Sequence, residues 1–157
     1  MPDVPVHSVI DSLKFHHVGV GTTSFEESIA VYQKLGYELL CSMNDDDLDL
    51  RVAFLEKVGS PLMEIIAPLG PDGPLKSFLS RRIFPSPYHT CYATDNIHAA
   101  GACLKELGFF PLGEPKPSRA LSGALFAFHY HNATGLIELV QSPTVWTQAV
   151  VRDGRAT

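Results

Sequence analysis

An internal repeat constrains the fold of this chain more than any other feature of its sequence. His17 and His89 each stand in a short run of apolar and small residues. Each precedes the leucine of a Leu-Gly pair, at 35–36 and at 107–108, by the same 18 positions, and a helix-like pattern fills both intervals. Spacing kept this closely predicts two copies of one supersecondary unit, each of which needs its neighbour to bury a face.

The two copies also end alike. An apolar segment with glutamate in third position closes each of them, LMEIIAP in the first and LIELVQS in the second. Glu64 follows His17 by 47 residues, and Glu138 follows His89 by 49. Each unit therefore carries one histidine near its start and one glutamate near its end.

Each unit has the pattern of a strand, a helix and three further strands (βαβββ). Thr23 and Ser24 precede two glutamates at capping-box spacing, which predicts a helix that ends at Gly36. In the second unit we expect Asp95 to cap a helix that ends at Gly108. The expected strands cover residues 14–21, 38–43, 50–55 and 62–67 in the first unit, and 88–94, 110–112, 124–131 and 136–141 in the second.

Four polar residues stand on strands that are otherwise apolar. Side chains alternate between the two faces of a strand, so each unit offers one histidine and one glutamate in apolar surroundings. A buried carboxylate without a partner costs several kcal/mol, and two of them at equivalent positions favour a shared cation. Imidazoles and carboxylates together suit a divalent metal. The four candidate ligands are His17, Glu64, His89 and Glu138.

Other histidines compete with this set. His16 adjoins His17, but only His17 has the 18-residue spacing to Leu35 that the second unit repeats. His129 and His131 stand two apart on one strand face and have no counterparts in the first unit. We expect this pair at solvated positions rather than at a metal.

Composition excludes several classes of function. A formal net charge of −5 leaves no basic face for a nucleic acid. The apolar runs are far shorter than the roughly 20 residues of a membrane span, and residues 1–9 lack the apolar core of a secretory signal. The three cysteines form no C-x-x-C motif, which favours reduced thiols and predicts a cytoplasmic protein.

The repeat and its four polar residues resemble the vicinal-oxygen-chelate superfamily of glyoxalases, bleomycin resistance proteins and dioxygenases. The resemblance spans about residues 15–142, and the ligand pattern is specific for the superfamily. The stretch PLGPDGPL at 68–75 is most similar to methylmalonyl-CoA epimerases. The resemblance implies that the four candidates bind a divalent metal ion, which would be Co, Ni, Zn, Mn or Fe.

Repeat and resemblance together predict the fold class. We expect an α+β fold in which two βαβββ modules form a curved, cup-like mixed β-sheet with the helices on the outside. The chain is expected to be one domain over residues 1–157. Within it we place the modules at about 14–68 and 87–143, a connector at 69–86, and short arms at both termini.

The activity that the resemblance implies is that of a metal-dependent isomerase or epimerase. Such an enzyme removes an α-proton and stabilises the resulting enolate at the metal. Asp47, in the acidic run 45–49, stands near the position of an epimerase glutamate, and either Asp47 or the ligand Glu138 would be the base. The substrate would be a small molecule, an acyl-CoA or another thioester, and we expect a homodimer with neither nucleic-acid nor membrane partners. The cations available to a CoA tail are Lys76, Arg81, Arg82, Lys116 and Arg119.

Two alternatives stay open. One is a glyoxalase I-like lyase that uses the same four ligands on a thiol adduct. The other is a non-catalytic protein of the same fold that binds a small molecule, as resistance proteins do. An Fe(II) dioxygenase fits less well, because it uses two histidines and a single carboxylate.

Overall fold

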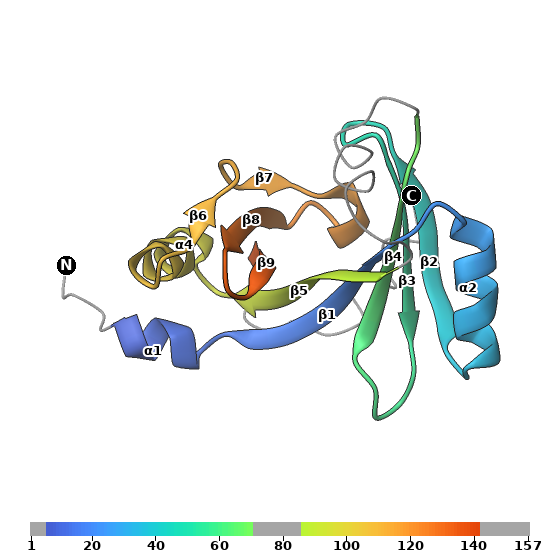
Figure 1. The fold of residues 1–157 in the computed structure, drawn as a ribbon, viewed down its shortest axis with the longest axis horizontal. Helices are drawn as coiled ribbons and strands as arrows, with labels where there is room; N and C mark the ends of the chain where they lie inside the picture. The colour runs from blue at the N-terminus through green and yellow to red at the C-terminus, as the bar shows by residue number, and fades with distance from the viewer. Residues whose placement is uncertain (1–5, 71–85, 142–157) are drawn as a thin grey trace.

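A computed structural model of the chain describes residues 6–70 and 86–141, and its framework is one mixed β-sheet (Figure 1). The sheet has nine strands in the order β2-β3-β4-β1-β5-β9-β8-β6, with β7 also paired to β8. The sheet is open rather than closed. Its mixed strand pairing, together with a few helices, confirms the predicted α+β class. In chain order the elements are α1 (Val6–Asp11), β1 (Lys14–Gly21), α2 (Phe25–Lys34), β2 (Glu38–Asp45), β3 (Leu50–Glu56), β4 (Leu62–Pro68), β5 (Ser86–Thr94), α4 (Ile97–Glu106), β6 (Phe110–Pro111), β7 (Lys116–Pro117), the 3-10 turn η1 (Arg119–Leu121), β8 (Leu125–His131) and β9 (Gly135–Gln141).

The pairing of the strands reproduces the sequence repeat. The first strand of each unit runs parallel to the last strand of the same unit, β1 beside β4 and β5 beside β9. The two units then meet through antiparallel pairing of β1 with β5 at the centre of the sheet. The first unit has the predicted βαβββ order. The second contains one strand more than predicted, because the short strands β6 and β7 both pair with β8.

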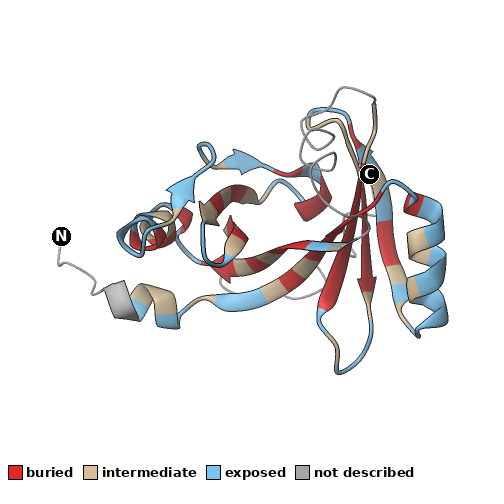
Figure 2. Cartoon of the chain, viewed as in Figure 1, coloured by how far each residue is buried: buried red, intermediate tan, exposed pale blue. Residues whose placement is uncertain are grey.

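Helices cover the outer faces of the sheet, as predicted (Figure 1). On one side α2 packs through Phe25 onto Val20, Leu55 and Ile65 of the first unit. In the second unit α4 packs onto β8 and β9, and its buried side chains include Ile97, Ala100 and Leu104. Figure 2 shows burial concentrated along the central strands. The faces of the strands that do not contact the helices therefore point to the inner, concave side of the sheet.

Both helix starts differ from the predicted caps. The Ser24 side chain makes no capping hydrogen bond to α2. Instead, the hydroxyl oxygen of Thr22 accepts hydrogen bonds from the backbone N–H of Ser24 at 3.0 Å and from the hydroxyl of Ser28 at 2.9 Å. At α4 the cap is Asn96, which accepts from the backbone N–H of Ala99 at 3.0 Å, so the prediction of Asp95 was wrong by one residue.

Other expectations concern the termini and the connector. The N-terminal arm includes the helix α1, which the sequence did not predict. Residues 71–85 of the connector and the C-terminal arm lie outside the described residues. The three cysteines are buried and form no disulfide. None of the helices in the described ranges is long and apolar enough to cross a membrane.

Candidate metal centre

Strand register places each predicted glutamate beside the predicted histidine of its own unit. In the β1–β4 pair, Glu64 stands opposite the residue two positions after His17. In the β5–β9 pair, Glu138 stands opposite the residue two positions after His89. The register is therefore the same in both units, and each histidine–glutamate pair lies on one face because residues two apart on a strand share a face.

The antiparallel pairing of β1 with β5 then brings the two pairs together. His89 stands opposite Gly19, and Cys91 stands opposite His17. A Cβ on residue 19 would lie 2.0 Å from Cε1 of His89, so the imidazole lies directly over a backbone that has no side chain. The missing side chain is what allows the two histidines to meet.

Two imidazole nitrogens and two carboxylate oxygens converge on one point. Nε2 of His17 lies 3.1 Å from Oε2 of Glu64 and 3.1 Å from Oε2 of Glu138. Nε2 of His89 lies 3.3 Å and 3.0 Å from the same two oxygens, and the two Nε2 atoms are 3.1 Å apart. All four residues are buried. The fold thus brings together the four side chains that the sequence pattern predicts as ligands.

These atoms fit a bound divalent cation. The Oε2 atoms of Glu64 and Glu138 are buried and accept no well-aligned hydrogen bond from any residue in the described ranges. Buried carboxylate oxygens without hydrogen bonds are costly unless a cation compensates them. Two nitrogen and two carboxylate ligands match the mixed donor sets of first-row divalent metals.

Without a metal, the four groups hold one another in charged forms. Burial by itself lowers the pKa of His89, yet the nearby carboxylates of Glu138 and Glu64 raise it above its ordinary value. Burial likewise raises the pKa of Glu138, but the close contacts with the imidazoles of His17 and His89 bring it well below its usual range. Both shifts favour an imidazolium–carboxylate cluster in the metal-free site.

His16 lies behind the metal centre and not within it. Its Nδ1 is 2.6 Å from Nδ1 of His17, the nitrogen that faces away from the four converging atoms. Burial, and next the charge of His17, lower the pKa of His16 to about 3, so its ring is neutral at physiological pH. His16, His17 and Cys91 also form a group whose potential ligand atoms lie within 4.8 Å of one another.

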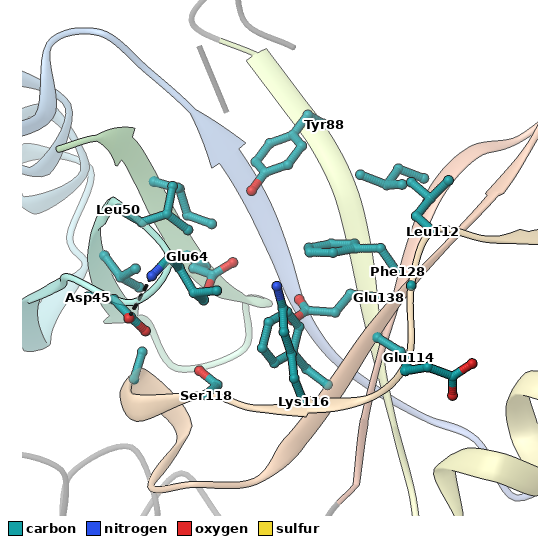
Figure 3. Close-up of a pocket in the computed structure, with 18 residues that line it drawn as sticks. Asp45, Leu50, Glu64, Tyr88, Leu112, Glu114, Lys116, Ser118, Phe128 and Glu138 are labelled. Carbon is teal, nitrogen blue, oxygen red and sulfur yellow. Dashed lines mark hydrogen bonds between the residues drawn. The ribbon is translucent and has the colours of Figure 1, made fainter. Parts of the chain in front are cut away.

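A cavity of about 470 Å³ opens over the carboxylates of the centre (Figure 3). This size is within the roughly 300–1,000 Å³ typical of small-molecule sites. Most of its wall is apolar, and includes Leu50, Ile66, Leu112 and Phe128. Its polar lining residues are Asp45, Glu64, Tyr88, Glu114, Lys116, Ser118 and Glu138.

The acidic run contributes a different residue to this cavity from the one expected. Asp47 is exposed and does not line the cavity, whereas Asp45 is only 2% exposed and does. The Asp45 carboxylate accepts a hydrogen bond from the backbone N–H of Leu48 at 3.2 Å (Figure 3). The sequence carried part of this signal, because alternation places Asp45 on the same face of β2 as Cys41 and Met43, whose side chains pack inside the sheet. It does not by itself distinguish Asp45 from Asp47.

His129 and His131, which we expected at solvated positions, are not fully exposed. His129 is buried, and an added Cβ at Gly101 of α4 would meet its Nε2 at 3.1 Å. His131 is half-buried, and its ring lies 5.0 Å from that of Phe109. Both therefore support the packing of the second unit, away from the four ligands.

Comparison with known proteins places this arrangement among relatives. The profile of the Glyoxalase/Bleomycin resistance protein/Dioxygenase superfamily matches residues 16–128. An ethylmalonyl-CoA/methylmalonyl-CoA epimerase of Cereibacter sphaeroides is 30% identical over 131 residues, which cover 82% of this chain and 97% of the relative. The crystal structure of methylmalonyl-CoA epimerase from Mycobacterium tuberculosis matches with a TM-score of 0.70 and 26% identity, over 82% of this chain and 88% of that one. A Streptomyces coelicolor methylmalonyl-CoA epimerase in complex with 2-nitronate-propionyl-CoA shares the fold, with a TM-score of 0.70 and 20% identity over 85% of this chain and 97% of that one.

Proposed function

The chain belongs to the glyoxalase/bleomycin resistance protein/dioxygenase superfamily, and we propose that it is a divalent-metal-dependent epimerase of a methylmalonyl-CoA-type thioester. One observation carries the proposal: four ligand atoms converge, and two of the residues that provide them, Glu64 and Glu138, line one largely apolar cavity together with the buried carboxylate of Asp45. The relatives reported above are methylmalonyl-CoA epimerases. They favour neither the glyoxalase-like lyase nor the non-catalytic binding protein.

Four side chains would hold the metal, namely those of His17, Glu64, His89 and Glu138. A divalent ion bound there would act as a Lewis acid toward carbonyl and carboxylate oxygens of the substrate. The two glutamates balance the charge of such an ion. The apolar walls of the cavity exclude water and so strengthen the electrostatic interactions within it.

We propose Asp45, rather than Asp47, as one of the two proton-transfer groups. An epimerase takes the α-proton on one face of the substrate carbon and returns a proton on the other face. Asp45 lies on β2 and Glu138 on β9, so the two carboxylates approach the cavity from opposite sides of the central β1–β5 pair (Figure 3). One accepts the proton while the electron pair stays on the substrate, and the other returns a proton to the opposite face.

Lys116 supports a substrate with an anionic group. It is the only basic residue among those that line the cavity within the described residues. Its ammonium lies 5.6 Å from the ring centroid of Phe126 and extends into the cavity (Figure 3). A malonyl-type thioester offers a carboxylate on the reacting carbon, which this ammonium would bind. Of the other candidate cations, Lys76, Arg81 and Arg82 lie outside the described residues, and Arg119 does not line the cavity.

Assembly and location complete the proposal. We expect a homodimer, as the family resemblance implies, and a measured solution mass of twice 17.2 kDa would support it. The three cysteines are buried and form no disulfide, which supports a reducing compartment such as the cytoplasm.

The proposal is tested by proton exchange. The protein is loaded with Co²⁺ and incubated in D₂O with one epimer of methylmalonyl-CoA, and with the hemithioacetal of methylglyoxal in a parallel sample. We expect exchange of the α-proton with conversion of the single epimer into a mixture of both epimers of the CoA ester, and no turnover of the hemithioacetal. Turnover of the hemithioacetal alone would indicate the lyase, and binding without either reaction would indicate a binding protein.

A further inference from the structure

The side chains of His16 and His17 touch although they are consecutive residues of one strand. Consecutive side chains of a regular strand point to opposite faces. Here the ring centroids are 4.9 Å apart and the two Nδ1 atoms are 2.6 Å apart. The cause is a β-bulge: Phe15 stands opposite Tyr92 and His17 opposite Cys91, so His16 has no counterpart of its own on β5. Bulges re-aim side chains in this way next to functional sites.

The short contact fixes where the hydrogen of His17 is once Nε2 of His17 binds an ion. A neutral imidazole carries one hydrogen, so one Nδ1 of the pair donates and the other accepts. If Nε2 of His17 carried the hydrogen, that nitrogen would face the other ligand atoms without a lone pair for a metal. Metal-binding histidines commonly donate their second N–H to a fixed partner, which sets the tautomer and the ring orientation.

We propose that His16 is a positioning residue for the metal centre. When an ion is bound, Nδ1 of His16 accepts the hydrogen bond from Nδ1–H of His17 and so holds the tautomer whose Nε2 faces the ion with a lone pair. The proposal rests on the metal site of the proposed function and adds a residue to it. It is independent of which thioester is the substrate.

The other unit provides an internal contrast. A second register shift, between Gly19 and Val20, leaves Tyr88 as the extra residue immediately before His89. The Tyr88 ring lies edge-on to His89, with centroids 4.5 Å apart. Nδ1 of His89 nevertheless has no hydrogen-bond partner in the part of the chain that is described. The two units therefore build the same bulge, but only the first uses it to hold an imidazole by hydrogen bonding.

Two other uses of this contact are less consistent with the geometry. Cys91 lies opposite His17 as a buried thiol, but sulfur is a weak acceptor compared with an imidazole nitrogen. A second ion between His16, His17 and Cys91 would need the two nitrogens further apart. Two nitrogens at about 2.0–2.1 Å from one tetrahedral zinc would stand roughly 3.3 Å from each other, whereas these are at hydrogen-bond distance.

The test is metal affinity, measured with Co²⁺ and Zn²⁺ in competition with a chromogenic chelator. His16→Phe keeps the ring and removes the acceptor, whereas His16→Asn restores an acceptor oxygen. We expect His16→Phe to weaken binding about 10- to 100-fold at unchanged stoichiometry of one ion per chain, and His16→Asn to recover most of the loss. His98→Phe, the same change at an exposed position of α4, is the matched control and should not alter affinity.

The outcomes are distinguishable. Equal affinities of the wild type and His16→Phe would overturn the proposal. Two ions bound by the wild type and one by His16→Phe would replace it with a second metal site. A larger loss in Cys91→Ala than in His16→Phe would assign the role to the thiol. Failure of the wild type itself to bind an ion would instead refute the proposed function.

A measurement on the unmodified protein covers the case in which the variants do not fold. In the Zn²⁺-loaded protein, long-range ¹H–¹⁵N correlation spectra report which nitrogen of His17 carries the hydrogen. We expect a protected Nδ1–H on His17, coupled to an unprotonated Nδ1 of His16. A hydrogen on Nε2 of His17 in the loaded protein would exclude the proposed role.

Discussion

The imidazole of His89 lies in the space that a side chain on Gly19 would need. A Cβ at residue 19 would approach three atoms of that ring to within 2.0–2.5 Å. The two residues stand opposite each other on β5 and β1, at the junction of the two units. The convergence of the four candidate ligands therefore depends on the absence of a side chain at Gly19 as well as on their own presence.

Gly19→Ala should destroy the centre. The added methyl group must displace His89, which removes one ligand, and overpacking of this kind costs about 1–3 kcal/mol of stability. We expect loss of stoichiometric Co²⁺ binding and a lower melting temperature. Gly101→Ala is the control, since it places a methyl group 3.1 Å from the imidazole of His129, away from the centre. Retention of full metal binding by Gly19→Ala would contradict the geometry.

Asp45→Asn and Asp47→Asn should show which of the two aspartates takes part in proton transfer. The amide that Asp45→Asn introduces cannot accept the α-proton, so we expect kcat to fall by about 10²- to 10⁴-fold with metal content unchanged. Asp47 is exposed, and its substitution should leave kcat within about twofold, as for surface changes in general. The measurement is α-proton exchange in D₂O. The opposite order of effects would restore Asp47 as the base.

Glu64→Gln and Glu138→Gln should differ in their effects on turnover. Either change removes one negative charge from the centre and should weaken binding of a divalent ion. We expect affinity to fall by at least the roughly 10- to 100-fold that follows from mutating residues that only support the ligands. Glutamine keeps an oxygen ligand, so metal-saturated Glu64→Gln should still exchange the α-proton. Metal-saturated Glu138→Gln should not, because Glu138 is also a proposed proton-transfer group. Equal turnover in both saturated variants would leave Glu138 as a ligand only.

Lys116→Met should weaken binding of malonyl-type thioesters selectively. A hydrogen bond to a charged group contributes about 1.5–3 kcal/mol, so we expect roughly a 10- to 100-fold weaker affinity for malonyl-CoA. Propionyl-CoA, which lacks the acyl carboxylate, should bind equally to variant and wild type. Lys105→Met on α4 is the matched control. An equal loss for both ligands would place Lys116 at the CoA phosphates instead.

Stability of the metal-free protein should decline at both ends of a narrow pH window. The raised pKa of His89 gives a contribution that is complete below the ordinary value of 6.5 and is lost as pH rises through the raised value. The pKa of Glu64 is lowered, because the effect of His17 and His89 outweighs that of burial. Its contribution to stability is therefore present above the ordinary pKa of 4.5 and is lost as pH falls through the lowered pKa.

Metal reverses the alkaline part of this dependence. Metal binding requires neutral imidazoles, so affinity and the melting temperature of the loaded protein should rise from about pH 6 to 8. Melting curves with and without a chelator across roughly pH 4–9 are the measurement. A metal-free protein whose melting temperature increases between about pH 7 and 9 would contradict the imidazolium–carboxylate cluster.

Much of the fold was predictable because the same spacing of residues occurs in both units of the sequence. The expected strand at 14–21 coincides with β1, and the expected strands at 50–55 and 62–67 are each one residue short of β3 and β4. Pairing of the last strand with the first within each unit then placed both glutamates. No such pattern covers β7, which has two residues, or the helix starts, where neighbouring polar side chains offer the same chemistry.

The parts that were not predictable depend on irregular backbone. Two residues of β1 and β5 interrupt the ladder, and simple alternation cannot say which side chain a bulge re-aims. The sequence therefore suggested His16 as a competitor of His17 for the metal, whereas in the structure the two side chains are in contact. Asp45 and Asp47 share one face of an extended chain, and only the turn after β2 separates the buried carboxylate from the exposed one.

The equal contributions of β1–β4 and β5–β9 bear on how such a chain could have arisen. A half-length ancestor with one imidazole and one carboxyl could have enclosed an ion only as a symmetric pair of separate molecules. Duplication and fusion would then have turned an intermolecular seam into the β1–β5 ladder. Within a single chain the two halves can vary separately, and they differ in the residue that precedes each candidate histidine ligand, His16 in one and Tyr88 in the other.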